Sequence, residues 1–220
     1  MTDHFFIFVT LIVYLSSMEK STKALIIVFT VLIIDQVLKI WIKTNMMLGQ
    51  EYQIFGDWFI IHFTENNGMA FGLEFWGKKG KIFLTLFRIA AVIGIGWYLV
   101  HLIRDNKPTG LIVSVSLIMA GAIGNIIDSV IYGEIFNHSY NQVAEFLPES
   151  GGYSSPLHGK VVDMLYFPII KGHYPEWFPF NAGQQFIFFR PVFNIADSAI
   201  TIGVISILVF QKKFFKHYEG

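Results

Sequence analysis

The 220-residue chain contains no cysteine, and only 15% of its residues are charged. Without cysteine, it can form no disulfide, no thiolate zinc site and no cysteine nucleophile. Its formal net charge of zero gives no support for nucleic-acid binding. Soluble domains carry about 25% charged residues, so this shortage indicates a membrane protein, as does the hydrophobic content of 54%.

Several catalytic signatures are also missing. There is no His-Glu-x-x-His sequence, and the seven histidines are scattered, which argues against a zinc peptidase. There is no Gly-x-Ser-x-Gly elbow either. Spacing leaves room for a Ser-Lys pair, but no serine stands beside a buried lysine in any predicted span. Carboxylates therefore remain the main candidates for chemistry.

Four apolar runs are long enough to cross a bilayer, at residues 24–42, 82–103, 111–127 and 192–210. Four spans place both termini on one side of the membrane. Lysines and arginines near the termini and in the 104–107 link predict that this side is cytoplasmic. We interpret residues 1–17 as an upstream N-terminal extension or a loosely held interfacial segment, of unassigned role. Residues 18–220 we interpret as a single four-helix membrane domain of the all-α class.

The links between the spans differ in character. Residues 44–80 are β-prone, with a turn at Gly56-Asp57, and predict a small β-sheet on the membrane surface. Residues 131–160 are polar and rich in turn residues, without an apolar run that could span. Residues 161–190 mix aromatics with prolines, which predicts interfacial loops.

The fourth apolar run contains one acid, Asp197. An aspartate at the centre of a span costs about 2.5–3.5 kcal/mol, and less near the interface, so it is a functional-site hypothesis with Asp163 as the best candidate partner. Two carboxylates within hydrogen-bonding reach share a proton. The ionised one can then take a proton from an attacking water, while the protonated one donates to the oxyanion or the leaving amine. This chemistry uses no metal.

Each of these acids also has a simpler interpretation. Asp163 alone fits a loop or cap aspartate, and Asp197 fits an N-terminal helix residue stabilised by the macrodipole. A carboxylate cluster could also bind a cation or relay protons in a transporter. Against a transporter, the sequence shows no second broken helix and no internal repeat.

Two further polar pairs lie within the spans. Asp35 and Lys39 are four residues apart on one helix face and can pair. They fit either an ion pair near the outer surface, with Lys39 snorkelling, or a polar anchor beneath an active site. Asn125 and Asp128 share a face where the third span ends, and the Gly-x-x-Gly spacing that begins at Gly121 predicts close helix packing.

Taken in chain order, these motifs resemble those of the lipoprotein signal peptidases (signal peptidase II), aspartic peptidases of the bacterial inner membrane. The matching blocks are Asp35-x-x-x-Lys39, Asn66-x-Gly68-x-Ala70-Phe71, Gly121-Ala-Ile-Gly-Asn125-Ile-Ile-Asp128, Val161-Val-Asp163 and Phe193-Asn194-Ile-Ala-Asp197-Ser198. All five blocks occur in the family's order, which makes the resemblance specific.

The resemblance implies four transmembrane helices, a periplasmic β-cradle and a periplasmic helix. It also implies an inner-membrane enzyme, with its active site near the periplasmic surface, that cleaves prolipoproteins before a cysteine carrying diacylglycerol. Asp163 and Asp197 would be its catalytic pair. Residues implied to line the site or to position the substrate or the pair are Asp35, Lys39, Asn66, Gly68, Asn125, Asp128 and Asn194. The implied partners are a diacylglyceryl-prolipoprotein and membrane lipid, without nucleic acid, cofactor or metal, and we expect a monomer.

One departure from the family concerns charge. Ser129 follows Asp128, where the family usually has arginine. A cation that could hold substrate carbonyls or the neighbouring carboxylate is therefore missing, and we consider Arg190 and Lys160 as replacements. 

The other departures concern spacing. Asp128 and Asp163 are 35 positions apart, and Asp163 and Asp197 are 34 apart, both longer than the family's usual links. These distances indicate outer-side insertions at about 131–160 and 166–190. The departures leave a catalytically silent relative with a structural role as an alternative.

Overall fold

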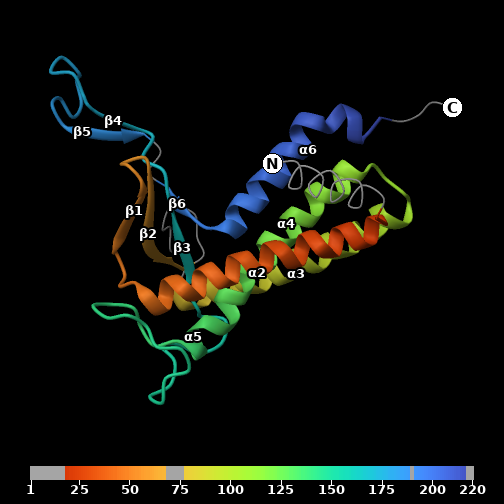
Figure 1. Cartoon of the computed structure of the whole chain (residues 1–220), viewed down its shortest axis with the longest axis horizontal. Helices are drawn as coiled ribbons and strands as arrows, with labels where there is room; N and C mark the ends of the chain where they lie inside the picture. Colours follow the sequence, from red (N-terminus) through yellow and green to blue (C-terminus); the bar gives the residue numbers. More distant parts are fainter. Residues whose placement is uncertain (1–17, 68–76, 189–190, 217–220) are drawn as a thin grey trace, which may run out of the picture. The chain divides into compact units, whose positions relative to one another are not determined.

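The computed structural model describes residues 18–67, 77–188 and 191–216 (Figure 1). Four of its helices are long and apolar enough to cross a membrane: α2 (Lys20–Asn45), α3 (Gly77–Arg104), α4 (Thr109–Ile127) and α6 (Ile195–Phe214). The four predicted spans are therefore confirmed. The predicted N-terminal extension lies outside the described residues, and the treatment of residues 18–220 as a single domain stays a prediction.

The third helix continues past the end of its apolar run. After α4 the chain forms a π-helical turn, η2 (Asp128–Tyr132), and then α5 (Gly133–Ile135). Asp128, expected where the helix leaves the bilayer, therefore lies inside a helical segment that runs from Thr109 to Ile135. Such π turns are rare and are frequently found at functional sites.

The predicted β-sheet is present and is larger than expected. Strands β1 (Glu51–Phe55) and β2 (Phe59–Asn66) form the predicted hairpin. Two further antiparallel strands, β3 (Val161–Tyr166) and β6 (Val192–Phe193), complete the order β1-β2-β3-β6, and Figure 1 shows β1, β2 and β3 side by side.

These two added strands correct the sequence interpretation. Residues 161–166 are a strand and not an interfacial loop, because β3 finds backbone partners on both edges, in β2 and in β6. The fourth span likewise begins at Ile195 and not at residue 192, because Val192 and Phe193 pair with β3. The second insertion contains another antiparallel pair, β4 (Ile170–His173) and β5 (Gln185–Phe188).

The chain divides into two compact units, and the first comprises Met1–Ile34, Ile89–Ile123 and Ala196–Gly220. Its described core consists of Ala24, Leu99, Leu102, Leu111, Ile112, Val115 and Phe214. Helices α4 and α6 approach closely there, because a Cβ added at Gly121 would lie 2.1 Å from the carbonyl oxygen of Ala196. Gly121 therefore serves close helix packing, as its spacing predicts.

The second unit comprises Asp35–Arg88 and Gly124–Ile195. Its core consists of Ile42, Met46, Phe63, Tyr132, Phe136, Ala144, Val162 and Met164. The first insertion folds back onto the π turn, where the Gly159 amide donates to the Ser129 carbonyl at 2.9 Å. A Cβ at Gly159 would lie 2.1 Å from the Asp128 carbonyl oxygen, so this close approach depends on glycine.

Candidate functional site

A buried lysine lies at the centre of the polar residues that α2 contributes to the second unit. The Lys39 side chain is 0% exposed, and its Nζ lies 2.9 Å from Asp35 Oδ2 and 2.8 Å from Asp128 Oδ2. Removing an ion from water costs several kcal/mol unless close partners compensate it, and here two carboxylates do so. The predicted pairing of Asp35 with Lys39 is present, but Lys39 does not snorkel, because its whole side chain is buried.

Asp128 is held without an adjacent arginine. Its Oδ2 accepts from Lys39 and from the Val162 amide at 3.2 Å, and its Oδ1 accepts from Gln36 Nε2 at 3.0 Å. Gln36 in turn accepts from the Tyr132 hydroxyl at 3.0 Å. Asp128 therefore has a cation at ion-pair distance, Lys39 of α2, although no arginine follows it in the sequence.

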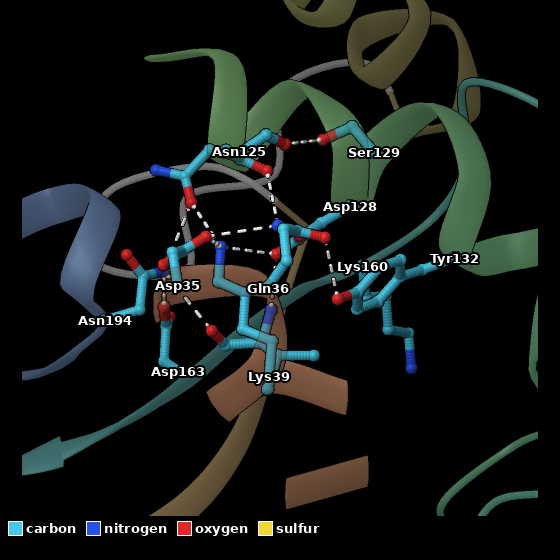
Figure 2. A network of polar contacts seen from close by, with 12 residues as sticks. Asp35, Gln36, Lys39, Asn125, Asp128, Ser129, Tyr132, Lys160, Asp163 and Asn194 are labelled. Carbon is cyan, nitrogen blue, oxygen red and sulfur yellow. Dashed lines mark hydrogen bonds and ion pairs between the residues drawn. The ribbon is translucent and has the colours of Figure 1, made fainter. Parts of the chain in front are cut away.

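An amide relay leads from Lys39 to Asp163 (Figure 2). Asn125 Oδ1 accepts from Lys39 Nζ at 3.0 Å and from Asn194 Nδ2 at 3.1 Å. Asn194 Nδ2 also lies 2.7 Å from Asp163 Oδ1, and Asn66 Nδ2 donates to Asp163 Oδ2 at 3.1 Å. Both carboxylate oxygens of Asp163 are thus held by neutral amide donors.

The sheet explains how the chain brings these groups together. Asp163 pairs with Thr64, and Asn66 pairs with Val161, so Asn66 and Asp163 are diagonal neighbours on adjacent strands. Asn194 follows β6 directly, and its Nδ2 also lies 3.3 Å from the Val162 carbonyl oxygen. The π turn brings Asp128 to the backbone amide of Val162, which belongs to β3. Strand β3 therefore connects residues from three distant parts of the sequence.

Of the predicted site residues, the second unit gathers Asp35, Lys39, Asn66, Asn125, Asp128, Asp163 and Asn194 in one network. Asp197 lies in the first turn of α6, half-buried, in the first unit. Its pairing with Asp163 stays a prediction. Gly68 and Arg190 lie outside the described residues.

Ser129 has a structural setting of its own. Its side chain is buried, and its hydroxyl donates to the Asn125 carbonyl oxygen at 3.0 Å. Lys160, considered as a replacement for the missing arginine, directs its Nζ to Glu65 Oε2 at 3.2 Å. A role for Lys160 at the substrate therefore stays a hypothesis.

A second buried lysine was not predicted from the sequence. Lys43, one turn beyond Lys39, is 0% exposed, and its Nζ lies 2.6 Å from Glu65 Oε1 and 3.1 Å from the Ser139 hydroxyl. The same Nζ lies 5.2 Å from the ring centroids of Phe136 and Tyr153. Its spacing of four residues from Lys39, on the same helix face, was the available signal.

Glu65 is the acid that joins this second cluster. Burial on its own would raise the pKa of Glu65, but the charges and hydrogen bonds of Lys43 and Lys160 outweigh burial and hold it below the usual value of 4.5. Burial raises the pKa of Tyr153, whose hydroxyl oxygen accepts from the Lys160 amide at 2.6 Å. Glu65 is therefore ionised at neutral pH, while Tyr153 keeps its proton.

The described residues offer no obvious metal site. Within 18–67, 77–188 and 191–216, no three His, Asp or Glu side chains are arranged so that they could hold a metal ion. The functional groups of the described network are carboxylates, amides and ammonium groups.

Comparisons with known proteins agree on one family. A family model described as signal peptidase (SPase) II matches residues 27–213. A lipoprotein signal peptidase of Porphyromonas gingivalis is 49% identical over 197 residues, which are 89% of this chain and 85% of that protein. A lipoprotein signal peptidase of Amoebophilus asiaticus is 38% identical over 82% of this chain and 73% of its own length.

The fold has a relative among solved structures as well. A structure described as a bacterial membrane enzyme, determined by the in meso method at 2.3 Å resolution, is 27% identical to this chain. It matches with a TM-score of 0.58 over 90% of this chain and 94% of its own.

Proposed function

Because the chain belongs to the signal peptidase II family, we propose that it is an aspartic endopeptidase that acts on diacylglyceryl-modified prolipoproteins. It removes the signal peptide by cleaving before the lipidated cysteine. The observation that supports this most is the setting of Asp163, whose two oxygens accept from Asn194 at 2.7 Å and from Asn66 at 3.1 Å. A carboxylate fixed at both oxygens is oriented before the substrate arrives.

In this proposal Asp163 and Asp197 form a pair that shares one proton. The ionised carboxylate takes a proton from water as the water oxygen attacks the scissile carbonyl carbon. The protonated carboxylate donates to the carbonyl oxygen. Collapse of the tetrahedral intermediate breaks the C–N bond: the leaving amine takes up a proton from one carboxyl, and a hydroxyl of the intermediate returns a proton to the other, so that the pair again holds one proton.

The remaining predicted residues position this chemistry. Asp35 and Asp128 hold Lys39, and Lys39 fixes the oxygen of Asn125. That oxygen accepts from Asn194, which fixes the amide that contacts Asp163. From the resemblance, we assign Gly68 to the substrate-binding wall.

We also propose where the enzyme works. The four candidate spans make it a multi-pass membrane protein, and the distribution of lysine and arginine favours cytoplasmic termini. In the bacterial inner membrane, this topology places the site near the periplasmic surface. There a monomer meets a diacylglyceryl-prolipoprotein in the lipid phase.

The test is cleavage of a purified diacylglyceryl-prolipoprotein by the purified chain, followed as a mass shift. Asp163→Asn and Asp197→Asn should each remain folded, by circular dichroism, and show no detectable product. Asp57→Asn, which changes an exposed acid in the β1–β2 turn, is the matched control and should cleave like the parent. Turnover near the parent rate by either dyad variant would reject the two-aspartate mechanism.

A further inference from the structure

The turn of the β4–β5 hairpin, residues 174–184, carries an exposed aromatic tip. Trp177 is 79% exposed and Phe180 is 74% exposed, the highest values among the large apolar side chains that the structure describes. Soluble surfaces seldom display two such side chains three residues apart, and exposed apolar groups of this size mark interaction sites.

The tip is held together by contacts among its own residues. The rings of Tyr174 and Phe178 stack with centroids 5.1 Å apart, and Trp177 meets Phe178 edge-on at 6.1 Å. Asn181 and Gly183 take positive φ values of 65° and 71° and close the turn. Trp177 is thus presented by a packed aromatic base, which reduces the entropy lost when it binds.

Much of the backbone of the turn is hydrogen-bonded within the turn. The amides of Tyr174, Phe178, Gly183 and Gln184 donate to carbonyl oxygens within the turn, at 2.9 to 3.0 Å. Pro175 and Pro179 have no N–H to satisfy. Six of the eleven residues therefore present no unpaired N–H, which lowers the cost of placing the turn close to lipid.

Charge and location favour lipid over a protein partner. Residues 172–184 contain no lysine or arginine, and their only acid is Glu176, so the tip has little with which to recognise a charged surface. The chain already spans a membrane four times, which keeps a bilayer within reach at high effective concentration.

The apolar surface continues into the sheet of the same unit. The rings of Phe59 and Phe167 stack at 4.7 Å, and exposed Trp58 lies 6.3 Å from Phe167. Phe167 stands just before the hairpin, which in Figure 1 projects from this end of the sheet. Aromatic side chains are enriched at membrane–water interfaces.

We propose that the 174–184 turn is a bilayer-interface anchor, in which Trp177 and Phe180 insert among lipid headgroups and upper acyl chains. The anchor lies between Asp163 and Asp197 in the sequence. It fixes the height above the bilayer of the unit that carries Asp163. This role is independent of the proposed peptidase mechanism.

The absence of cysteine makes a direct test available, because an introduced cysteine can be spin-labelled uniquely. Ala182→Cys places a nitroxide beside the tip while keeping Trp177 and Phe180. Glu149→Cys places one at an exposed site on the first insertion, as a control. Both full-length proteins are reconstituted in phosphatidylcholine vesicles. Paramagnetic resonance then measures how accessible each label is to oxygen, which partitions into lipid, and to a water-soluble nickel chelate.

The anchor predicts an oxygen-to-nickel accessibility ratio several-fold higher at position 182 than at position 149. Adding Trp177→Ser and Phe180→Ser should lower the ratio at 182 to the control value, while circular dichroism stays unchanged. Equal ratios at the two positions would overturn the proposal. A label at 182 that neither reagent reaches would also overturn it, because the tip would then be covered by protein, such as a second copy of the chain.

Discussion

Lys39 and Lys43, one helical turn apart on α2, are equally buried but lie among different groups. Both side chains are 0% exposed. Lys39 faces two carboxylates and the oxygen of Asn125, whereas Lys43 faces one carboxylate, a hydroxyl and aromatic rings. The first environment continues through Asn194 to Asp163, and the second connects helix, sheet and first insertion through Glu65 and Ser139.

The two lysines therefore have different roles: the Lys39 charge supports the residues around Asp163, whereas the Lys43 charge stabilises the fold. Lys39 balances two acids, Asp35 and Asp128, and among the described residues Asp128 has no second cation within 4 Å. Glu65 has Lys160 as a second cation. Removing Lys39 therefore takes the cation away from two buried carboxylates, whereas removing Lys43 affects only Glu65, which keeps Lys160.

The comparison predicts its largest effect for Lys39→Met. Two buried carboxylates would lose the cation that lies within 3 Å of both, and breaking such a buried pair costs about 3–5 kcal/mol. We expect a large drop in the thermal unfolding midpoint in detergent, together with loss of prolipoprotein cleavage. Adding Asp128→Asn should restore part of the stability, because one stranded charge is removed. A Lys39→Met protein as stable as the parent would contradict this interpretation.

Glu65→Gln should have the next largest effect, with a defined dependence on pH. It leaves the buried Lys43 ammonium without its counter-charge. Because the folded pKa of Glu65 lies below 4.5, its charge stabilises the protein fully above that pH, and this contribution is lost as the pH falls through the folded pKa. The stability gap between parent and variant should therefore narrow on acidification. If the difference in stability between parent and variant widened as the pH fell, the predicted pH dependence would be wrong.

A smaller loss is expected for Lys43→Met. The methionine can pack against the surrounding rings, and Glu65 keeps Lys160 at 3.2 Å. The variant loses the hydrogen bonds of the Lys43 ammonium to Glu65 and to the Ser139 hydroxyl, but Ser139 still donates to Glu65 at 3.0 Å. Hydrogen bonds to charged groups contribute about 1.5–3 kcal/mol each, so the protein should unfold earlier than the parent but later than Lys39→Met, which leaves two buried acids without Lys39. Cleavage per folded molecule should be retained. Equal losses of stability and of cleavage in Lys43→Met and Lys39→Met would contradict the different roles assigned to the two lysines.

The smallest effect is expected for Tyr153→Phe. The ring that lies 5.2 Å from Lys43 remains, and only the acceptor of the Lys160 amide is lost. A single neutral hydrogen bond contributes about 1 kcal/mol. Chemical unfolding of the variant beside Tyr52→Phe, an exposed tyrosine on β1, measures that contribution.

Local patterns predicted the parts of this protein that local physics controls. The length of the apolar runs predicted the four spans, and the four-residue spacing of Asp35 and Lys39 predicted that their side chains pair. Strand β3 was missed because its partners lie far away in the chain, as the 97 positions between Asn66 and Asp163 illustrate. An aromatic, proline-rich stretch does not reveal which distant edge it will join.

The candidate site was also predicted in part. The resemblance named the residues of the Lys39 network, but not Gln36, which bonds Asp128 and Tyr132. It also left the Lys43 cluster unassigned, since a lysine near a helix end is ordinarily an interfacial residue. Whether such a lysine is buried depends on Ser139 and Tyr153, which belong to the first insertion.

The Asp35–Lys39 pair also bears on how the chain enters the membrane during synthesis. Asp128 is translated long after α2, so Lys39 must cross into lipid before its second carboxylate exists. With Asp35 one turn earlier on the same face, the Lys39 charge can enter the bilayer already paired with an opposite charge. Asp128 then joins an ion pair already in place when α4 packs, so biogenesis never exposes an isolated lysine charge at this position to the bilayer.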